Sequence, residues 1–222
     1  MISYFYLHGL ASSPQSYKAV ELRDRFQSRH IPCTCPDFNQ GDFFNLTLTR
    51  QIQQVEALLH QPSNQPLNQP LNQQPVYLIG SSLGGLTAAW LAERNPAVQR
   101  ILLLAPAFEF LQHWLPQLGD EQVALWRQAR SLPLYHYGAK RKLPLGDRFL
   151  LDLEQYDDRQ LQRPIPMLIL HGLHDEVIPV EASRRYAAER PWVELVELES
   201  DHGLGNAIGE IWDQAQRFFD LS

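Results

Sequence analysis

The strongest candidate for a reactive side chain in this sequence is a serine at the centre of a Gly-x-Ser-x-Gly pattern. The pattern runs from Gly80 to Gly84 with Ser82 at its centre. Four apolar residues precede it (76–79), and residues 86–94 are typical of a helix. A serine at the apex of a strand–turn–helix unit exposes its hydroxyl for nucleophilic attack, and the glycines let strand and helix approach closely. Ser82 is therefore the candidate nucleophile.

An aspartate and a histidine that could activate this serine follow two later strand-like segments. A serine hydroxyl needs a base to take its proton, and the imidazole that acts as base needs an anionic acceptor on its other nitrogen. Asp175 follows the apolar segment 165–170, and His202 follows the segment 192–198. The sequence predicts that His202 is the base and that Asp175 orients it.

Two backbone N–H groups are candidates for stabilising the negative charge that nucleophilic attack places on a carbonyl oxygen. Leu83 comes directly after the candidate nucleophile, and Leu10 lies in the loop after the first predicted strand. Donors at these two positions would form an oxyanion hole. No metal ion and no organic cofactor is expected.

Three neighbouring residues are alternatives to these assignments. Ser81 lies off the apex of the glycine pattern, so a structural role is favoured for it. Glu176 and Asp201 could take the place of Asp175 as the acid. Adjacent residues point in different directions, and Asp201 is too close in sequence to the histidine to turn back on it easily, so Asp175 is preferred.

The chain has eight histidines, so a single histidine carries little weight without a partner pattern. His8 and His171 precede glycines at predicted strand ends, and we expect them to hold loops by hydrogen bonds rather than to transfer protons. His174 could line the site or lie on the surface. The sequence around the other four histidines suggests no particular role for them; they are His30, His60, His113 and His136.

Strand-like and helix-like segments alternate along the chain and would position these residues. Strands are expected at residues 2–7, 31–37, 76–79, 98–105, 165–170 and 192–198, and helices at 16–30, 46–60, 86–94, 181–190 and 204–219. This alternation predicts an α/β fold with a mainly parallel sheet of about six strands and helices on both faces. The ligand site of such a sheet lies at the carboxyl ends of its strands, where the candidate nucleophile, acid and base would meet.

Two stretches interrupt the alternation. Residues 106–163 contain aromatic residues, several prolines and short helical segments but no convincing strand, which predicts a helical cap inserted between two strands of the sheet. Residues 61–75 contain three tandem copies of Pro-x-Asn-Gln, which predict a solvated low-complexity loop. We expect the whole chain, residues 1–222, to form a single domain that carries both features.

Charge and composition argue against several classes of partner. The net charge of −6 disfavours a nucleic-acid partner. No apolar run approaches the roughly 20 residues that a membrane helix needs, and the N-terminus lacks the basic region of a secretory signal, so no membrane association and a cytoplasmic location are expected. Cys33 and Cys35 are the only cysteines, and we expect them to be core thiols.

A basic cluster in the predicted cap stands out in this acidic chain. Lys140, Arg141 and Lys142 are consecutive, and Arg148 follows nearby. The cluster could attract an anionic substrate such as an acyl-coenzyme A or a carboxylate-bearing ester, or it could be a solvated part of the cap surface. The cap aromatics are expected to be mostly core, with one or two lining an acyl pocket.

The motifs quoted above resemble those of the α/β-hydrolases, whose triads follow the same chain order of serine, aspartate and histidine. More narrowly, the opening segment Tyr6–Pro14, followed by Ser16 and by Lys18 and Ala19, is similar to that of the small bacterial YqiA-like esterases. Further similar segments extend the resemblance over nearly the whole chain and comprise residues 80–85, 90–94, 171–175 and 201–203. The resemblance implies a compact α/β-hydrolase fold without the first two strands of the full sheet, and esterase activity on short acyl chains.

The sequence therefore predicts a serine carboxylic-ester hydrolase that forms an acyl-enzyme at Ser82 and acts on a small ester. One alternative is a thioesterase, or a lyase or carbon–carbon hydrolase, that uses the same triad on an anionic metabolite. A second alternative is a non-catalytic ligand-binding protein on the same fold, whose signature would be loss of the nucleophile or the histidine. The natural substrate and the oligomeric state cannot be read from the sequence.

Overall fold

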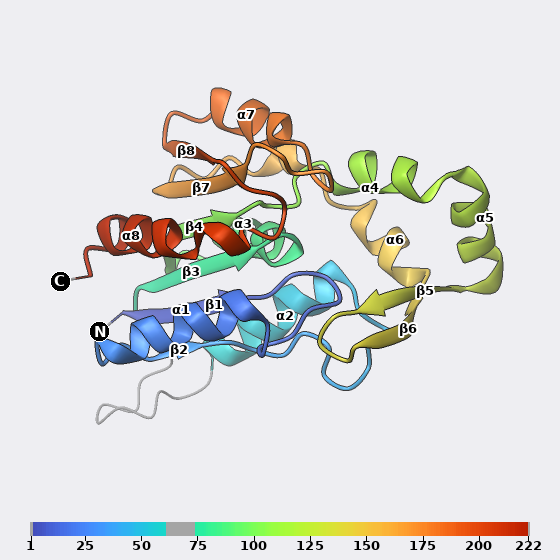
Figure 1. The fold of residues 1–222 in the computed structure, drawn as a ribbon, viewed down its shortest axis with the longest axis horizontal. Helices are drawn as coiled ribbons and strands as arrows, with labels where there is room; N and C mark the ends of the chain where they lie inside the picture. Colours follow the sequence, from blue (N-terminus) through green and yellow to red (C-terminus); the bar gives the residue numbers. More distant parts are fainter. Residues whose placement is uncertain (1, 61–73, 222) are drawn as a thin grey trace.

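A six-stranded parallel sheet forms the centre of the molecule, as the alternation of segments predicts (Figure 1). The computed structural model describes residues 2–60 and 74–221, so the low-complexity loop expected at residues 61–75 lies almost entirely outside the described residues. The strands are β1 (Ser3–Leu7), β2 (Cys33–Thr34), β3 (Val76–Ser81), β4 (Val98–Leu104), β7 (Met167–Gly172) and β8 (Val193–Leu198). They are arranged in the order β2-β1-β3-β4-β7-β8, and every neighbouring pair is parallel.

Helices cover both faces of the sheet, and each face has its own hydrophobic cluster. The helices α1 (Tyr17–Ser28) and α8 (Ile208–Phe219) cover one face, and α2 (Leu48–Leu59), α3 (Leu83–Arg94) and α7 (Val180–Ala188) cover the other. Successive side chains of a strand point to opposite faces, so Phe5 packs with α2 and α3 whereas Tyr4 packs with α1 and α8. The central strands are buried on both faces and are therefore almost continuously apolar.

The second strand is much shorter than the sequence predicts. Only Cys33 and Thr34 pair with β1, whereas a strand was expected over residues 31–37. Pro32 directly precedes the pair and Pro36 follows two residues after it, and proline has no N–H to donate to a ladder, which keeps the strand short. Cys33 and Cys35 are free thiols, but they are only partly buried and pack against the cluster under α1 and α8 rather than within it.

The stretch between β4 and β7 contains a hairpin that the sequence prediction missed. This stretch comprises α4 (Phe110–Leu118), α5 (Asp120–Ala129), β5 (Ser131–His136), β6 (Arg141–Gly146) and α6 (Arg148–Leu153). The expectation of no strand over residues 106–163 was wrong, because β5 and β6 form a two-stranded antiparallel sheet in which Pro133 faces Pro144. Both strands of such a sheet are edges, so prolines that obscure the strand pattern are tolerated there.

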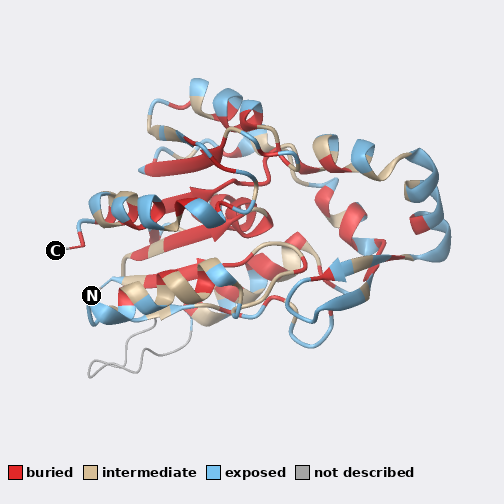
Figure 2. Cartoon of the chain, viewed as in Figure 1, coloured by how far each residue is buried: buried red, intermediate tan, exposed pale blue. Residues whose placement is uncertain are grey.

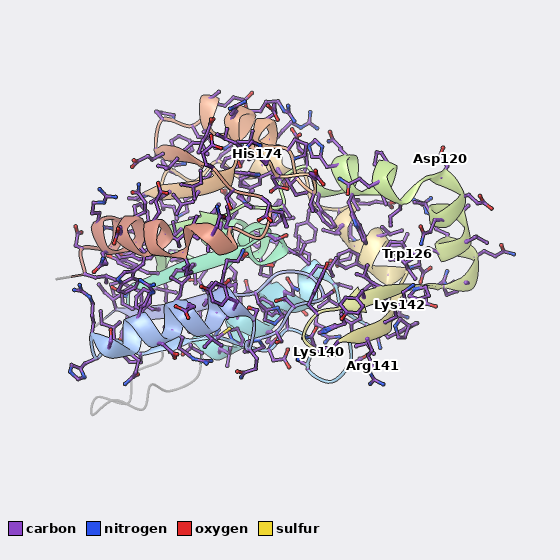
Figure 3. The ribbon with its side chains drawn as sticks, viewed as in Figure 1. Asp120, Trp126, Lys140, Arg141, Lys142 and His174 are labelled. Atoms are coloured by element: carbon purple, nitrogen blue, oxygen red, sulfur yellow. The ribbon has the colours of Figure 1, made fainter. Side chains whose placement is uncertain are left out.

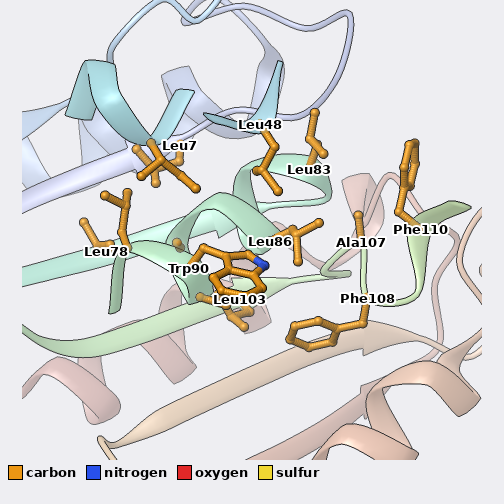
Figure 4. Close-up of a cluster of buried hydrophobic side chains, with 14 of the residues drawn as sticks. Leu7, Leu48, Leu78, Leu83, Leu86, Trp90, Leu103, Ala107, Phe108 and Phe110 are labelled. Atoms are coloured by element: carbon orange, nitrogen blue, oxygen red, sulfur yellow. The ribbon is translucent and has the colours of Figure 1, made fainter. Parts of the chain in front are cut away.

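The inserted segment has an aromatic core that is continuous with the core on the α2–α3 face. Figure 2 shows that its outer surface is largely exposed, particularly along α5. Trp126 is the buried residue of α5, and its indole N–H donates to the Leu145 carbonyl at 3.0 Å (Figure 3). Trp114 and Phe149 pack edge-on at 6.1 Å, and Phe110 stacks on Trp114. All three belong to the same hydrophobic cluster as Leu86 and Trp90, part of which is drawn in Figure 4. Trp114 and Trp126 are part of the core, as the sequence predicts for most of the cap aromatics. Tyr135 and Tyr137 are exposed instead, because they lie at the end of the β5–β6 hairpin.

No helix of residues 2–60 and 74–221 is both long enough and apolar enough to cross a membrane.

Candidate active site

Ser82 lies at the sharp turn between β3 and α3, with a backbone conformation that is unusual for a residue with a side chain. Its φ is +54° and its ψ is −121°. Such a conformation costs on the order of 1–3 kcal/mol and persists only where the surroundings fix it. The Ser82 N–H donates to the Leu104 carbonyl at 2.9 Å, and the Ser82 carbonyl accepts from Leu86 N and Ala107 N. The central strands and α3 thus hold the serine in place.

The glycines of the motif are needed for close approach. A Cβ atom at Gly84 would overlap the Leu7 carbonyl oxygen, and a Cβ atom at Gly80 would overlap the Gly84 carbonyl oxygen. Neither glycine is among those with positive φ. The start of α3 therefore packs directly on the end of β1, and this contact brings the loop after β1 to Ser82.

We expect Gly84→Ala to destabilise the fold, because the new methyl group would meet rigid backbone at the end of β1. The free energy of unfolding should fall by about 3 kcal/mol, at the upper end of the usual cost of overpacking. Gly209→Ala is the matched control, since no atom lies within 4 Å of the position that its methyl group would take in α8, and alanine favours a helix by up to about 1 kcal/mol. Chemical denaturation of both purified variants tests the contrast, and equal stabilities would contradict it.

The structure brings together the three residues that the sequence singles out. The Ser82 hydroxyl oxygen lies 3.0 Å from His202 Nε2, and His202 Nδ1 lies 2.7 Å from Asp175 Oδ2. These residues come from the carboxyl ends of β3, β7 and β8. The Asp175 side chain is fully buried, whereas 24% of the His202 side chain is exposed. Asp175 therefore anchors this series of contacts in the core, whereas His202 is accessible from the solvent.

Hydrogen bonds hold Asp175 in its ionised form. Asp175 Oδ1 accepts from the backbone N–H groups of Val177 at 2.9 Å and of Ile178 at 2.8 Å. Burial by itself would raise the pKa of Asp175, but the hydrogen bonds from His171 and His202 outweigh it and hold the pKa below its usual range. The site thus maintains an anion beside the His202 imidazole.

His171 is a partner of Asp175 that the sequence reasoning missed. It does hold a loop, as expected, because its Nε2 atom donates to the Ile178 carbonyl at 2.9 Å and its Nδ1 atom accepts from the Ser183 hydroxyl at 2.7 Å. The same Nε2 atom also lies 3.1 Å from Asp175 Oδ2. The four-residue spacing between His171 and Asp175 was the available signal, but it gains meaning only once the loop geometry is known.

The alternative residues lie apart from this chain of contacts. Ser81 is buried and its side chain hydrogen-bonds the Tyr6 hydroxyl. Asp201 is exposed and accepts from the Leu204 N–H at 3.1 Å. Glu176 is exposed, and the exposed ring of His174 pairs with Glu199 at 3.0 Å. None of them supplies the acceptor that Asp175 provides.

The two candidate oxyanion donors lie next to the serine. A Cβ atom at Gly9 would lie 3.2 Å from the Ser82 Cβ atom, so the loop that carries Leu10 passes directly over Ser82. Leu83 is the first residue of α3, where helix N–H groups lack intrahelical acceptors. Within residues 2–60 and 74–221, neither the Leu10 N–H nor the Leu83 N–H donates to a backbone carbonyl. Both are free to bind an oxygen atom of a ligand.

One lysine lies close to the site, and a group of basic residues lies on the exposed hairpin. Burial lowers the pKa of Lys18 to about 8, while the nearby carboxylates of Asp201 and Asp175 act in the opposite direction, so its ammonium group lies close to the acid end of the site. Lys140, Arg141 and Lys142 are exposed on the β5–β6 hairpin (Figure 3). Within the described part of the chain these three form no ion pair. The hairpin cations are thus available to a ligand or to solvent.

A cavity of about 500 Å³ lies near α3 and the inserted segment. Leu86, one helical turn after Ser82, lines it together with Phe110, Leu153 and Tyr156. Asp158 also lines it, and burial raises the pKa of this carboxyl group to about 6. The lining includes neither Ser82 nor His202, so the cavity is adjacent to the site rather than part of it.

Solved structures with the same architecture cover almost the whole chain. A protein from Agrobacterium vitis S4, assigned provisionally to the hydrolases, is 21% identical with a TM-score of 0.82 and covers 98% of this chain and 87% of its own. Alpha/beta hydrolase domain-containing protein 10 from mouse is 21% identical with a TM-score of 0.77 and covers 99% and 90%. Est1E from Butyrivibrio proteoclasticus with bound ferulic acid is 17% identical with a TM-score of 0.80 and covers 99% and 88%. At these identities the likeness establishes the fold.

The family comparison agrees with the resemblance found in the sequence. No curated protein matches the chain. The profile of the Uncharacterised protein family (UPF0227) matches residues 3–220. The chain therefore belongs to the UPF0227 family, the YqiA-like group that its sequence resembles, and has the α/β-hydrolase fold.

Proposed function

We propose that the protein is a serine carboxylic-ester hydrolase that works through an acyl-enzyme intermediate at Ser82. The observation that carries the proposal is the chain of contacts from the Ser82 hydroxyl through His202 to the buried Asp175 carboxylate, at 3.0 Å and 2.7 Å. A ligand-binding protein would not need a buried anion aligned behind an imidazole and a strained serine. The free N–H groups of Leu10 and Leu83 add support.

In the first half-reaction, His202 Nε2 takes the Ser82 proton as the serine oxygen bonds to the ester carbonyl carbon. Asp175 stabilises the resulting imidazolium, and the N–H groups of Leu10 and Leu83 bind the oxyanion. His202 then gives its proton to the departing alkoxide oxygen, and the alcohol leaves. In the second half-reaction, water gives a proton to His202 and its oxygen displaces the acyl group from Ser82, which regains its proton.

We propose small esters as the substrate class. The structural neighbour Est1E has ferulic acid bound, and ferulic acid is a small carboxylic acid of the size that an ester hydrolase of this kind would release. The sequence resemblance to the YqiA-like esterases implies short acyl chains.

The test combines turnover with covalent labelling. Hydrolysis of p-nitrophenyl esters of increasing acyl length should be fastest for short chains. A fluorophosphonate should label the protein, and mass spectrometry should find the adduct on the peptide that contains Ser82. Absence of both turnover and labelling would overturn the proposal and favour the ligand-binding alternative.

A second candidate is a thioesterase, or a lyase or carbon–carbon hydrolase, that uses the same residues on an anionic metabolite. The exposed cations Lys140, Arg141 and Lys142 favour it, since the chain is otherwise acidic. Turnover of an acyl-coenzyme A and of a neutral ester should be compared at increasing ionic strength. Steering by these cations predicts that only the reaction of the anionic substrate weakens with salt.

A further inference from the structure

The loop after β1, residues 9–14 (the oxyanion loop), contains a strained residue directly after Leu10. Ala11 has a φ of +54°, in the left-handed region that residues with a side chain rarely occupy. A conformation of this kind persists only when surrounding contacts fix it. One such contact is the hydrogen bond from the Tyr137 N–H, at the end of β5, to the Ala11 carbonyl at 2.8 Å. The inserted hairpin therefore touches the oxyanion loop directly.

The next carbonyl of the loop is held through two side chains in series. Asn39 Nδ2, in the loop after β2, donates to the Ser12 carbonyl at 2.8 Å. Asn39 Oδ1 accepts from His136 Nε2, at the end of β5, at 2.9 Å. Asn39 thus uses both ends of its amide: Oδ1 contacts the hairpin, and Nδ2 donates to the oxyanion loop and also to Asp37 Oδ1 at 2.8 Å. Segments that are far apart in the sequence are joined at this point.

The protonation state of His136 is determined by its surroundings. Its Nδ1 atom accepts from the Ala139 N–H at 3.0 Å, so the ring proton must be on Nε2, where it points to Asn39. The residue is 4% exposed, and its ring packs edge-on against Phe43 at 4.8 Å. Burial, and then the nearby His8, lower the pKa of His136, which favours the neutral ring that this arrangement needs.

We propose that Asn39 and His136 are positioning residues for the oxyanion hole. By fixing the Ser12 carbonyl they hold the turn at Ala11, and this turn sets the direction of the Leu10 N–H. Their effect should appear in the transition state, where the oxyanion forms, rather than in substrate binding. The inference rests on the proposed function and extends it, because it makes catalysis depend on how the hairpin is seated.

The kinetic test uses variants that interrupt the link at one residue at a time. Asn39→Ala and His136→Asn remove the link between hairpin and loop; the asparagine can still accept from Ala139 but is too short to reach Asn39. We expect kcat for a short p-nitrophenyl ester to fall about 10- to 100-fold with KM unchanged, somewhat less than the loss of a whole oxyanion donor. His136→Gln keeps a donor at the position of Nε2 and should retain most of the activity.

The control separates positioning from a general loss of stability. Thr47→Ala removes the side-chain acceptor that caps α2, which Arg50 N contacts at 3.0 Å, and so should lower Tm without touching the oxyanion loop. Its kcat should match the wild type. An equal loss of kcat in Thr47→Ala and Asn39→Ala at matched Tm would overturn the inference.

Hydrogen exchange provides a readout that does not need activity. The amide protons of residues 9–13 should exchange faster in Asn39→Ala and His136→Asn than in the wild type or in His136→Gln. If the wild type shows no Ser82-dependent hydrolysis, the proposed function fails, and exchange alone decides whether these side chains hold the loop. Unchanged exchange, or faster exchange with unchanged kcat in an active protein, would overturn the inference.

Discussion

Replacing Ser82 with alanine is expected to reduce kcat for ester hydrolysis by about 10⁴- to 10⁶-fold, the range found when a triad nucleophile is removed. The change deletes the atom that bonds to the carbonyl carbon. The fold should survive, because His202 is the partner of the lost hydroxyl within the described residues and the backbone contacts of the turn remain. Initial rates on a short p-nitrophenyl ester, with the circular dichroism spectrum of the same sample, measure both effects.

The adjacent serine is the matched control for this prediction. Ser81 is buried and interacts with the Tyr6 hydroxyl rather than with His202, so Ser81→Ala should keep kcat within a few-fold of the wild type. Fluorophosphonate labelling should persist in Ser81→Ala and disappear in Ser82→Ala. Residual turnover at the wild-type level in Ser82→Ala would show that another group attacks the substrate.

Asp175→Asn is expected to lower kcat by about 10⁴-fold, as in triads whose acid becomes an amide. Asparagine Oδ1 can still accept from Val177 N and Ile178 N, so the loop should keep its shape. The amide nitrogen would then occupy the position of Oδ2 and meet the N–H groups of His171 and His202. His202 would lose its acceptor and favour the wrong tautomer. The control is Asp201→Asn, which changes an exposed carboxylate beside His202. Its kcat should be close to that of the wild type.

The same variant has a signature in the pH dependence of stability. The folded-state pKa of Asp175 lies below its unfolded value of about 4, so its ionised form stabilises the fold above that value, and this contribution is lost as pH falls toward the folded-state pKa. Asp175→Asn should therefore show a flatter loss of unfolding free energy below about pH 4 than the wild type. Urea denaturation at several acidic pH values measures this slope, and parallel curves would contradict the prediction.

The sequence was sufficient to predict the sheet and to place three candidate residues at one edge of it, because both depend on local patterns. Ser82 lies between an apolar strand and a helix, and Asp175 and His202 follow strands whose carboxyl ends must share one edge of a parallel sheet. Once the alternation of segments is recognised, topology brings the residues together. Their roles remain predictions that the variants above test.

Features that depend on contacts across the fold were not predictable in this way. The β5–β6 hairpin was missed because Pro133 and Pro144 interrupt its strand pattern, and their pairing opposite each other is visible only in three dimensions. The link from His136 to Asn39 joins residues 97 positions apart, with no shared motif. The contact of His171 with Asp175 likewise depends on a loop conformation that α7 and its Ser183 hydroxyl stabilise.

The short strand β2 affects how copies of the protein could associate with one another. Each exposed border of a sheet offers unsatisfied N–H and C=O groups to other chains and is a potential template for aggregation. One border here is only two residues long, with Pro32 directly before it and Pro36 two residues after it. The other, β8, displays Glu197, which Arg184 clamps with two hydrogen bonds of 2.7 Å. Both borders disfavour strand addition, so among residues 2–60 and 74–221 we expect the helices and the inserted segment to offer the surfaces for any self-association.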